Sequence, residues 1–349
     1  MNQDKNTVDL SQKDIKRILI IKWSAMGDLA IATAIFEDVH RAFPDAQIDL
    51  NTLPTWKNFF VNDPRFNKLI CINVRHKGQK FKALREWLST VRKNRYDLII
   101  DLQANDRSRF MLSILRLTFS RIRWFLGINK QYPYNIYPEL FLRNTFKRAQ
   151  AGLRAAGIET HTDHPVIHYA QENANNAARL QQQYKLEPQQ YAVFFPGSQA
   201  EGYLKRWGVE NYANLAAMLA HQGVSKTILI GAGEEADECA AIAKANPKHI
   251  IDLCNQTKIL DIVPLCADAR YLVANDTGTA RIAAATQTPM VMIFGPTNPE
   301  RDLPGGNVAA VQADIKELPC IKCFKKHCSH HSCMKIVTPE NIMQSLLKL

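Results

Sequence analysis

The sequence predicts an α/β protein built around two doubly wound parallel sheets. Short apolar runs alternate with amphipathic helical patterns, and the complete strand and helix series occurs twice along the chain. Several runs are continuously apolar, as expected of parallel strands that helices cover on both faces. The chain has 349 residues, 46% of them hydrophobic, which is enough for two hydrophobic cores of ordinary size.

The strand pattern occurs in both halves of the chain. The predicted strands are 17–22, 47–51, 68–73, 97–102 and 123–126, followed by 191–195, 226–230, 250–253, 271–274, 290–294 and 308–312. Helical patterns lie between them, for example at 30–42, 209–222 and 235–245.

A polar, Gln/Asn-rich helical segment at 171–183 separates the two halves. We therefore expect an N-terminal Rossmann-like domain at 1–170, a second Rossmann-like domain at 171–335, and a C-terminal helix within 336–349.

The net charge of +11 indicates an anionic partner, such as nucleic acid, a phosphorylated sugar or an acidic membrane surface. The absence of a long Lys/Arg run argues against a nucleic-acid-binding tail. The polar N-terminus lacks the apolar region of a signal peptide, and the apolar stretch at 111–119 is too short to span a bilayer. We expect a cytoplasmic protein that can rest on a membrane face.

Two loops of the second half combine groups that suit a diphosphate. Ser198 follows a Pro-Gly turn at a strand end, and Lys205 comes shortly after it; backbone N–H groups, a hydroxyl and an ammonium group can bind phosphate oxygens. Asp276-Thr277-Gly278 closes another strand and opens a helix, whose N-terminus attracts anions. Asp276 would repel phosphate unless it pairs with Lys205 or caps the helix. A solvated turn and a plain helix cap are the alternative interpretations.

Two further loops give weaker indications. Gly231-Ala232-Gly233-Glu234-Glu235 lets the backbone approach a ligand and offers a carboxylate to a ribose, although two glycines also serve tight strand–helix packing. Gly295-Pro296-Thr297-Asn298-Pro299 either walls a pocket or forms a structural turn.

The first half places Asp28 at the start of a helix, where the helix dipole favours its ionised form. Facing a cleft, it could take a proton from an acceptor hydroxyl; otherwise it only caps the helix. The loop 101–109 also follows a strand, and its polar, basic residues suit an anionic acceptor or simply a solvated surface.

A cysteine cluster ends the second half. Cys320, Cys323, Cys328 and Cys333 resemble a metal site by number, with His327, His330 and His331 between them. Their spacing is tighter than that of common zinc modules and differs from iron–sulfur patterns. We expect a small basic loop that is either stapled by disulfides or rich in free thiols, and keep the metal site as the alternative.

Together these segments resemble the ADP-heptose:lipopolysaccharide heptosyltransferases, glycosyltransferase family 9, over nearly the whole chain. The resemblance lies in Lys22-Trp23-Ser24-Ala25-Met26-Gly27-Asp28-Leu29, in Pro196-Gly197-Ser198 with Lys205-Arg206-Trp207, and in Asp276-Thr277-Gly278 through Ala283-Ala284-Ala285 to Phe294-Gly295-Pro296-Thr297. The order and spacing of the three motifs make it specific. The tail with Cys333-Met334 and Thr338-Pro339 is similar to those of the second- and third-heptose enzymes.

The resemblance implies a GT-B fold, in which the two Rossmann-like domains face each other across a cleft and hold acceptor and donor, respectively. It also implies inversion at the anomeric carbon, with Asp28 as general base and Lys205 steadying the departing diphosphate. The expected donor-binding residues are Ser198, Gln199, Glu235 (or its neighbour Glu234), Thr257, Asp276, Thr277, Gly278 and Arg281. The expected acceptor-binding residues are Ser24, Met26, Gly27, Asn105, Arg107 and Arg109.

The implied partners are ADP-heptose and a lipopolysaccharide core or lipid A acceptor, with peripheral contact to the cytoplasmic face of the inner membrane and no nucleic acid. No cofactor or metal is obligatory, and Mg²⁺ at most stimulates. Family members commonly carry His three residues after the Asp-Thr-Gly turn, where this chain has Arg281. Transfer of another nucleotide-linked sugar therefore stays an alternative, as does a Cys-cluster metal or redox protein with a regulatory nucleotide site. An NAD-dependent oxidoreductase is disfavoured because no GxGxxG follows the first strand of either half.

Overall fold

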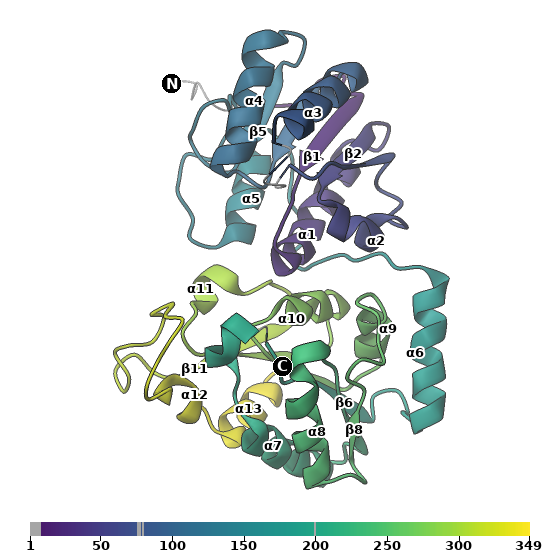
Figure 1. The fold of residues 1–349 in the computed structure, drawn as a ribbon, viewed down its shortest axis with the longest axis vertical. Coiled ribbons are helices and arrows are strands. Elements are labelled where there is room, and N and C mark those ends of the chain that lie inside the picture. The colour runs from purple at the N-terminus through teal and green to yellow at the C-terminus, as the bar shows by residue number, and fades with distance from the viewer. Residues whose placement is uncertain (1–7, 75–77, 79, 199) are drawn as a thin grey trace. The chain divides into compact units, whose positions relative to one another are not determined.

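The computed structural model describes residues 8–74, 78, 80–198 and 200–349. The chain forms two compact units, Met1–His168 and Tyr169–Leu349. Figure 1 shows that each unit has its own central sheet with helices around it.

The first unit contains a five-stranded parallel sheet with the order β3-β2-β1-β4-β5. Its strands are β1 Arg17–Ile21, β2 Gln47–Thr52, β3 Lys68–Cys71, β4 Leu98–Asp101 and β5 Trp124–Gly127. Its helices are α1 Met26–Ala42, α2 Lys57–Phe60, α3 Lys80–Asn94, α4 Asp106–Thr118 and α5 Thr145–Ala155, with a short 3₁₀ helix η1 at Pro54–Trp56.

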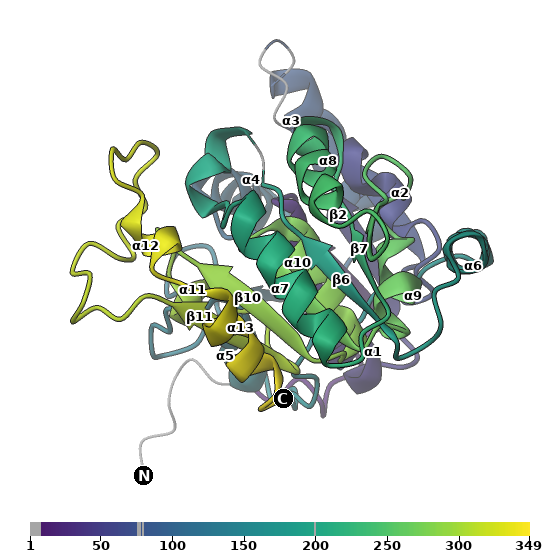
Figure 2. The ribbon, with the colours of Figure 1, turned by 90° about the horizontal axis from the view of Figure 1, so that it is seen from below.

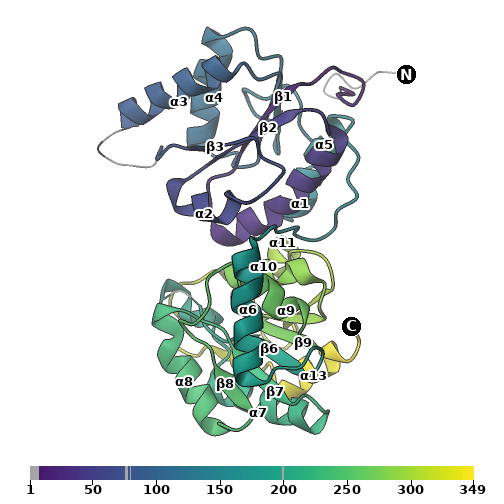
Figure 3. The ribbon, with the colours of Figure 1, turned by 90° about the vertical axis from the view of Figure 1, so that its right-hand side faces the viewer.

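Helices cover both faces of this sheet. Helices α3 and α4 lie on one face, and α1 packs against α5 on the other (Figure 3). All four residues of β4 are buried, because side chains on both faces of a strand in such a sheet contact helices.

The second unit contains a six-stranded parallel sheet with the order β11-β10-β9-β6-β7-β8. Its strands are β6 Tyr191–Phe195, β7 Lys226–Leu229, β8 Ile250–Asp252, β9 Tyr271–Asn275, β10 Met290–Phe294 and β11 Val308–Gln312. Its helices are α6 Gln171–Tyr184, α7 Val209–His221, α8 Ala236–Ala245, α9 Ile262–Ala267, α10 Gly278–Ala283, α11 Pro299–Asp302, α12 Ser332–Lys335 and α13 Pro339–Leu346, with 3₁₀ segments η2 Ala200–Lys205, η3 Gly233–Glu235 and η4 Ala284–Thr286.

The helices of the second unit pack in two groups. Helix α7 lies between α8 and α13, whereas α9 packs against α6 and α10 (Figure 2). Ile342 and Leu346 of α13 are buried in the same core as Tyr212 of α7, so the C-terminal helix belongs to the second unit.

Both sheets reverse their strand order beside the first strand. In the first sheet, β1 pairs with β2 on one side and β4 on the other. In the second sheet, β6 pairs with β7 and β9 in the same way. The loops after β1 and β4, and after β6 and β9, therefore border the crevice in which doubly wound folds bind ligands.

The structure confirms the predicted α/β class, and each of the predicted strands is present within one to two residues. Two helices differ from the prediction. The helix predicted from residue 30 begins at Met26, so that Asp28 is its third residue. The helix predicted to open at Asp276-Thr277-Gly278 is α10, which ends at Ala283 and is followed by the 3₁₀ turn η4.

Candidate functional site

The loop after β1 is held in place by the loop after β4. The side-chain oxygen of Gln103 accepts hydrogen bonds from the backbone N–H groups of Trp23, at 2.9 Å, and Ser24, at 3.2 Å. The indole of Trp23 is fully buried and donates to Asn51 Oδ1 at 2.9 Å. This fixes the chain immediately before α1.

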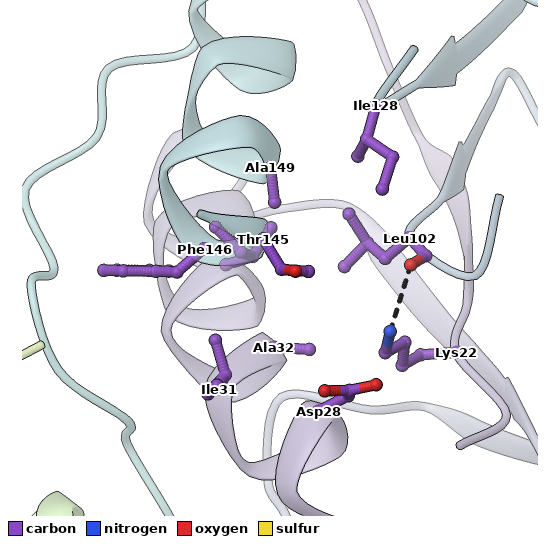
Figure 4. A pocket seen from close by; sticks show the side chains of 10 residues that line it. Lys22, Asp28, Ile31, Ala32, Leu102, Ile128, Thr145, Phe146 and Ala149 are labelled. Carbon is purple, nitrogen blue, oxygen red and sulfur yellow. Dashed lines mark hydrogen bonds between the residues drawn. The ribbon is translucent and has the colours of Figure 1, made fainter. Parts of the chain in front are cut away.

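Asp28 stands in the first turn of α1, where its Oδ2 accepts a hydrogen bond from the backbone N–H of Ala25 at 3.4 Å. Figure 4 shows its carboxylate at the edge of a pocket, on the same side as Lys22, whose Nζ donates to the carbonyl oxygen of Leu102 at 3.2 Å. The rest of the lining is mainly apolar: Ile31, Ala32, Ile35, Ile128, Thr145, Phe146 and Ala149. A half-buried carboxylate beside an ammonium group is suited to accept a proton from a bound hydroxyl.

The other predicted acceptor residues occupy two places. Gly27 is buried and Ser24 and Met26 are partly buried, next to Asp28 at the start of α1. Asn105 is the N-cap of α4, because its side chain accepts from the backbone N–H of Ser108 at 2.9 Å. Asn105 therefore caps a helix, a role that was not predicted from the sequence.

The two predicted arginines lie in the first turn of α4, with Arg107 exposed and Arg109 paired with Asp106. Just before this turn, the buried carboxylate of Asp101 accepts from the hydroxyl of Tyr134 at 2.8 Å and from the backbone of Gln103 at 2.9 Å. Asp101 thus shapes the loop rather than presenting a charge to solvent.

In the second unit, Asn275 ties the loops after β6 and β9 together. Its side-chain nitrogen donates to the carbonyl oxygens of Pro196 and, at 3.3 Å, Gly197. Its side-chain oxygen accepts from the hydroxyl of Tyr212 at 3.1 Å. The sequence analysis missed this residue, although an Asn at the end of an apolar strand is a polar group that needs buried partners.

Asp276 is buried between two cations. Its Oδ2 lies 3.0 Å from Lys205 Nζ and its Oδ1 lies 2.8 Å from Arg281 Nη2. Lys205 Nζ also donates to the carbonyl oxygen of Asp276 at 3.2 Å. Burial by itself would raise the pKa of Asp276, but the charges of Arg281 and Lys205 outweigh it and hold the pKa below its ordinary value. The carboxylate is thus ionised at neutral pH. Arg281 also lies 4.0 Å from the carboxylate of Asp302, so two carboxylates face the two cations.

Thr277, rather than Asp276, caps the next helix. Its hydroxyl accepts from the backbone N–H of Ala280 at 3.3 Å, and Gly278 is the first residue of α10. Of the two tasks considered for Asp276, the structure assigns pairing with Lys205. Arg281 is a second partner, and its Nε donates to the carbonyl oxygen of Asp302 at 3.2 Å.

Ser198 is buried at the end of the loop after β6. Its hydroxyl donates to the carbonyl oxygen of Gly202 at 2.8 Å, and its own carbonyl accepts from Arg206 Nη2 at 2.7 Å. These bonds fold η2 back onto the loop and bring Lys205 towards Asp276. Gln199 lies outside the described residues.

The Glu235 side chain lies against the loop after β6. Its Oε2 accepts from the backbone N–H of Ala232 at 2.9 Å, and burial raises its pKa. A Cβ atom on Gly197 would lie 2.3 Å from the carboxyl group of Glu235, so only glycine fits there. Glu235 and the Pro196–Ser198 loop are therefore in direct contact.

Thr257, one of the expected donor-binding residues, is partly buried in the loop after β8. In the same loop, Asn255 Oδ1 accepts from the backbone N–H of Gly233 at 2.8 Å. The structure thus links the loop that carries Thr257 to the glycine loop that carries Glu235. Glu234, the neighbour of Glu235 in the same glycine loop, is exposed.

Comparison with known proteins decides the family. The model of glycosyltransferase family 9 (heptosyltransferase) matches residues 84–334. The chain belongs to glycosyltransferase family 9. It is therefore a glycosyltransferase, and the predicted family and enzyme class are confirmed.

Relatives within family 9 match almost end to end. Lipooligosaccharide heptosyltransferase 2 of Haemophilus ducreyi is 27% identical, over 95% of this chain and 99% of the relative. A family 9 glycosyltransferase from Veillonella parvula has a TM-score of 0.80 at 18% identity, covering 99% of this chain and 100% of the other. The E. coli ADP-heptose lps heptosyltransferase II has a TM-score of 0.69 at 20% identity, covering 95% and 98%. These likenesses confirm the GT-B class of fold.

The structure also shows whether the chain has a membrane-spanning helix and what state its clustered cysteines are in. Within the described residues, no helix combines the length and the apolar character needed to cross a membrane. The four cysteines at 320–333 are free thiols, of which Cys320 and Cys323 are exposed, Cys328 is partly buried and Cys333 is buried.

Proposed function

We propose that this family 9 glycosyltransferase transfers L-glycero-D-manno-heptose from ADP-heptose to the inner core of lipopolysaccharide, with inversion at the anomeric carbon. The observation that carries the proposal is the Lys205–Asp276–Arg281 cluster beside the β6/β9 crevice, where two basic side chains meet the loops that doubly wound folds use for nucleotides. The heptosyltransferase relatives, which are named for heptose, ADP-heptose and lipopolysaccharide or lipooligosaccharide, suggest the sugar and the acceptor.

The donor diphosphate has suitable partners in this crevice. Lys205 is about one third exposed, so its ammonium group can reach a ligand while it keeps its bond to Asp276. Backbone N–H groups of the loops after β6 and β9, with the hydroxyl of Thr277, would bind the phosphate oxygens. Glu235 and Thr257 would contact the ribose and the base.

In the proposed reaction, the acceptor hydroxyl oxygen attacks the anomeric carbon from the face opposite the diphosphate. The new C–O bond forms as the bond between the anomeric carbon and the diphosphate oxygen breaks, and ADP departs. Asp28 takes the proton of the hydroxyl, and Lys205 stabilises the negative charge that develops on the leaving diphosphate. No step requires a metal, so Mg²⁺ would only stimulate.

The acceptor carries phosphate groups, which agrees with the net charge of +11. We place the enzyme at the cytoplasmic face of the inner membrane, where the basic residues Arg107 and Arg109 would contact the lipopolysaccharide core. Peripheral contact needs no membrane-spanning helix.

Transfer of radiolabelled heptose from ADP-heptose to a truncated core tests the proposal. Asp28→Asn should lower kcat by roughly 100- to 10,000-fold, because general-base catalysis contributes about that much. The exposed Asp45→Asn is the matched control and should keep full turnover. No transfer by the wild type would refute the proposed activity, and full turnover by Asp28→Asn would refute the role of Asp28.

A second candidate is transfer of another nucleotide-linked sugar, which stays open because Arg281 departs from the family pattern described above. A thermal-shift panel of nucleotide sugars separates the two, since at equal concentration the donor that binds most tightly raises Tm the most. The largest shift is expected with ADP-heptose.

A further inference from the structure

Four large apolar side chains of the first unit are exposed to solvent. Phe81 lies in the first turn of α3, Phe110 in the second turn of α4, and Leu140 and Phe141 shortly before α5. Their side chains are between 59% and 89% exposed, and we call these four residues the apolar rim. Grouped apolar side chains on a surface mark a site of interaction.

The apolar rim lies at one edge of the sheet. All five strands of the first unit are parallel, so their carboxyl ends share an edge. Helix α3 begins after β3 and α4 begins after β4, which places Phe81 and Phe110 near that edge, and the two helices lie side by side (Figure 3). Asp28, which follows β1, lies at the same edge.

Helix α5 ties Leu140 and Phe141 to this edge as well. Thr145, the first residue of α5, lines the same pocket as Asp28 (Figure 4). Phe141 comes four residues before Thr145, and the guanidinium carbon of Arg148 lies 5.0 Å from the centroid of its ring. An exposed aromatic ring is thus held beside a positive charge, close to the proposed acceptor pocket.

Basic residues accompany the apolar rim. The segments 80–94, 105–118 and 138–148 hold eleven Lys and Arg residues but only three Asp and Glu residues, which accounts for most of the net charge of +11. One of the three acidic residues, Asp106, is paired with Arg109. The exposed basic side chains are Lys82, Arg85, Arg107, Arg143 and Lys147.

An anionic bilayer complements such a surface. Apolar side chains enter the boundary between headgroups and acyl chains, while lysine and arginine contact the lipid phosphates. A protein partner suits the surface less well, because the cores of protein–protein interfaces are depleted of lysine, whereas here Lys82 follows Phe81 directly. A bilayer also needs no shaped groove to receive side chains from three separate segments.

We propose that the apolar rim and its basic neighbours dock the first unit on an anionic lipid bilayer, with the edge that carries Asp28 turned towards the lipid. Docking would bring Asp28 to the bilayer surface, where a lipid-anchored acceptor presents its sugars. This benefit for turnover rests on the proposed function, whereas binding to the bilayer does not.

The test is co-sedimentation of the full chain with vesicles that contain neither lipopolysaccharide nor nucleotide. The wild type should bind vesicles of phosphatidylethanolamine with about 30% phosphatidylglycerol, and should bind vesicles of pure phosphatidylcholine far more weakly. Raising the salt concentration from about 0.1 M to about 0.5 M should weaken the binding, since salt screens the attraction between basic side chains and lipid phosphates.

A double variant, Phe81→Ser with Phe141→Ser, tests the apolar rim. Its affinity for the anionic vesicles should fall roughly 10- to 100-fold, because two phenyl rings no longer enter the bilayer. The matched control is Ile315→Ser with Phe324→Ser, which changes two exposed apolar residues of the second unit and should bind like the wild type. All four side chains are exposed, so the Tm of both variants should stay near that of the wild type.

A second pair of variants tests the charge. Lys82→Glu with Arg143→Glu should weaken binding to the anionic vesicles about tenfold or more. Lys244→Glu with Lys248→Glu reverses as many exposed charges on the second unit and should have a much smaller effect.

Wild-type protein that stays in the supernatant with anionic vesicles would overturn the proposal, as would a rim variant that binds like its control. A wild-type dimer that the rim variant converts to monomers would also overturn it, because the surface would then join two copies of the chain. Heptose transfer separates this proposal from the proposed function. The rim variant should keep wild-type turnover of a soluble, deacylated core and lose most turnover of an acceptor embedded in vesicles. Vesicle binding by a wild type that transfers no heptose would refute only the proposed function.

Discussion

Asp276 places a negative charge at a site that we assign to a diphosphate, and its neighbours explain how this is possible. Each carboxylate oxygen faces a different cation, Lys205 on one side and Arg281 on the other. A buried carboxylate with both partners is stable, whereas loss of either partner leaves an expensive unpaired charge. The pair with Lys205 was predictable from charge alone. Arg281 was not, because the sequence does not reveal how a helix of six residues aims its side chains.

The hydrogen-bond partners of Asn275 and Asn51 could not be predicted from the sequence either. Each lies in a buried part of a strand and bridges buried groups: Asn275 connects two loops, and Asn51 accepts from both Trp23 and Trp87. Partners that are far apart in the sequence become visible only when the strands are paired.

At the residue scale, we predict that Glu238 makes the stability of the protein depend on pH. Burial raises its pKa to about 7, which Arg206, at 3.3 Å, lowers in part and Glu235 raises. Between 4.5, its ordinary value, and about 7, the folded protein holds a proton that the unfolded chain releases, so this group costs stability as the pH rises through that window. Glu238→Gln should therefore gain about 2–4 °C in Tm over the wild type at pH 8 and little at pH 5.

Calorimetry at the two pH values measures this difference. The exposed Glu210→Gln on α7 is the control and should show no such change with pH. An equal gain at pH 5 and pH 8 would show that Glu238 does not titrate in this range.

At the scale of elements, continuous apolar runs predicted the strands well. A strand that helices cover on both faces needs apolar side chains at nearly every position, so its sequence is easy to recognise. The 3₁₀ segments were not predicted. Two hydrogen bonds hold the segment η2 in place. The Ser198 hydroxyl donates to the carbonyl oxygen of Gly202, and Arg206 donates to the carbonyl oxygen of Ser198. Such bonds depend on how the loop meets α8, where Glu238 pairs with Arg206.

Gly197 carries a prediction at this scale, because it lets the loop after β6 touch the segment with Glu235. In Gly197→Ala, the new methyl group would lie 2.3 Å from the carboxyl group of Glu235 and displace it. We expect ADP affinity to fall about tenfold or more, the cost of one lost charge-assisted hydrogen bond. Isothermal titration with ADP measures the affinity.

Gly202→Ala is the matched control in the same segment. A Cβ atom there would meet Ser198 Oγ at 3.4 Å, an ordinary contact, so its affinity should stay near that of the wild type. A Gly197→Ala protein that binds ADP normally would exclude Glu235 from the nucleotide site.

At the scale of the whole molecule, each unit has a complete parallel sheet and a core of its own. Trp23, Trp87 and Tyr96 are buried in the first unit, and Trp207, Tyr212 and Met334 in the second. The repeated strand series predicted this division. The assignment of α13 to the second core needed the structure, because a short amphipathic helix at a chain end can pack on many surfaces.

We expect the second unit to fold and to bind nucleotide without the first. A fragment of residues 169–349 should unfold cooperatively in urea and bind ADP with a Kd close to that of the full chain, because the proposed donor contacts all lie within it. The same fragment with Asp276→Ala should lose ADP binding. A well-folded fragment that cannot bind ADP would mean that the first unit supplies part of the nucleotide site.

The two cations around Asp276 also have a consequence for the end of the reaction cycle. Arg281 is held between Asp276 and Asp302, whereas among the described residues Lys205 pairs with Asp276 alone and is partly exposed, so Lys205 is the cation that the phosphates of a ligand can reach. Free ADP bears more negative charge than an ADP-linked sugar, because its terminal phosphate is no longer esterified. The spent nucleotide is thus attracted more strongly than the fresh donor. Product inhibition, relieved by salt, and a turnover limited by the departure of ADP follow from this imbalance.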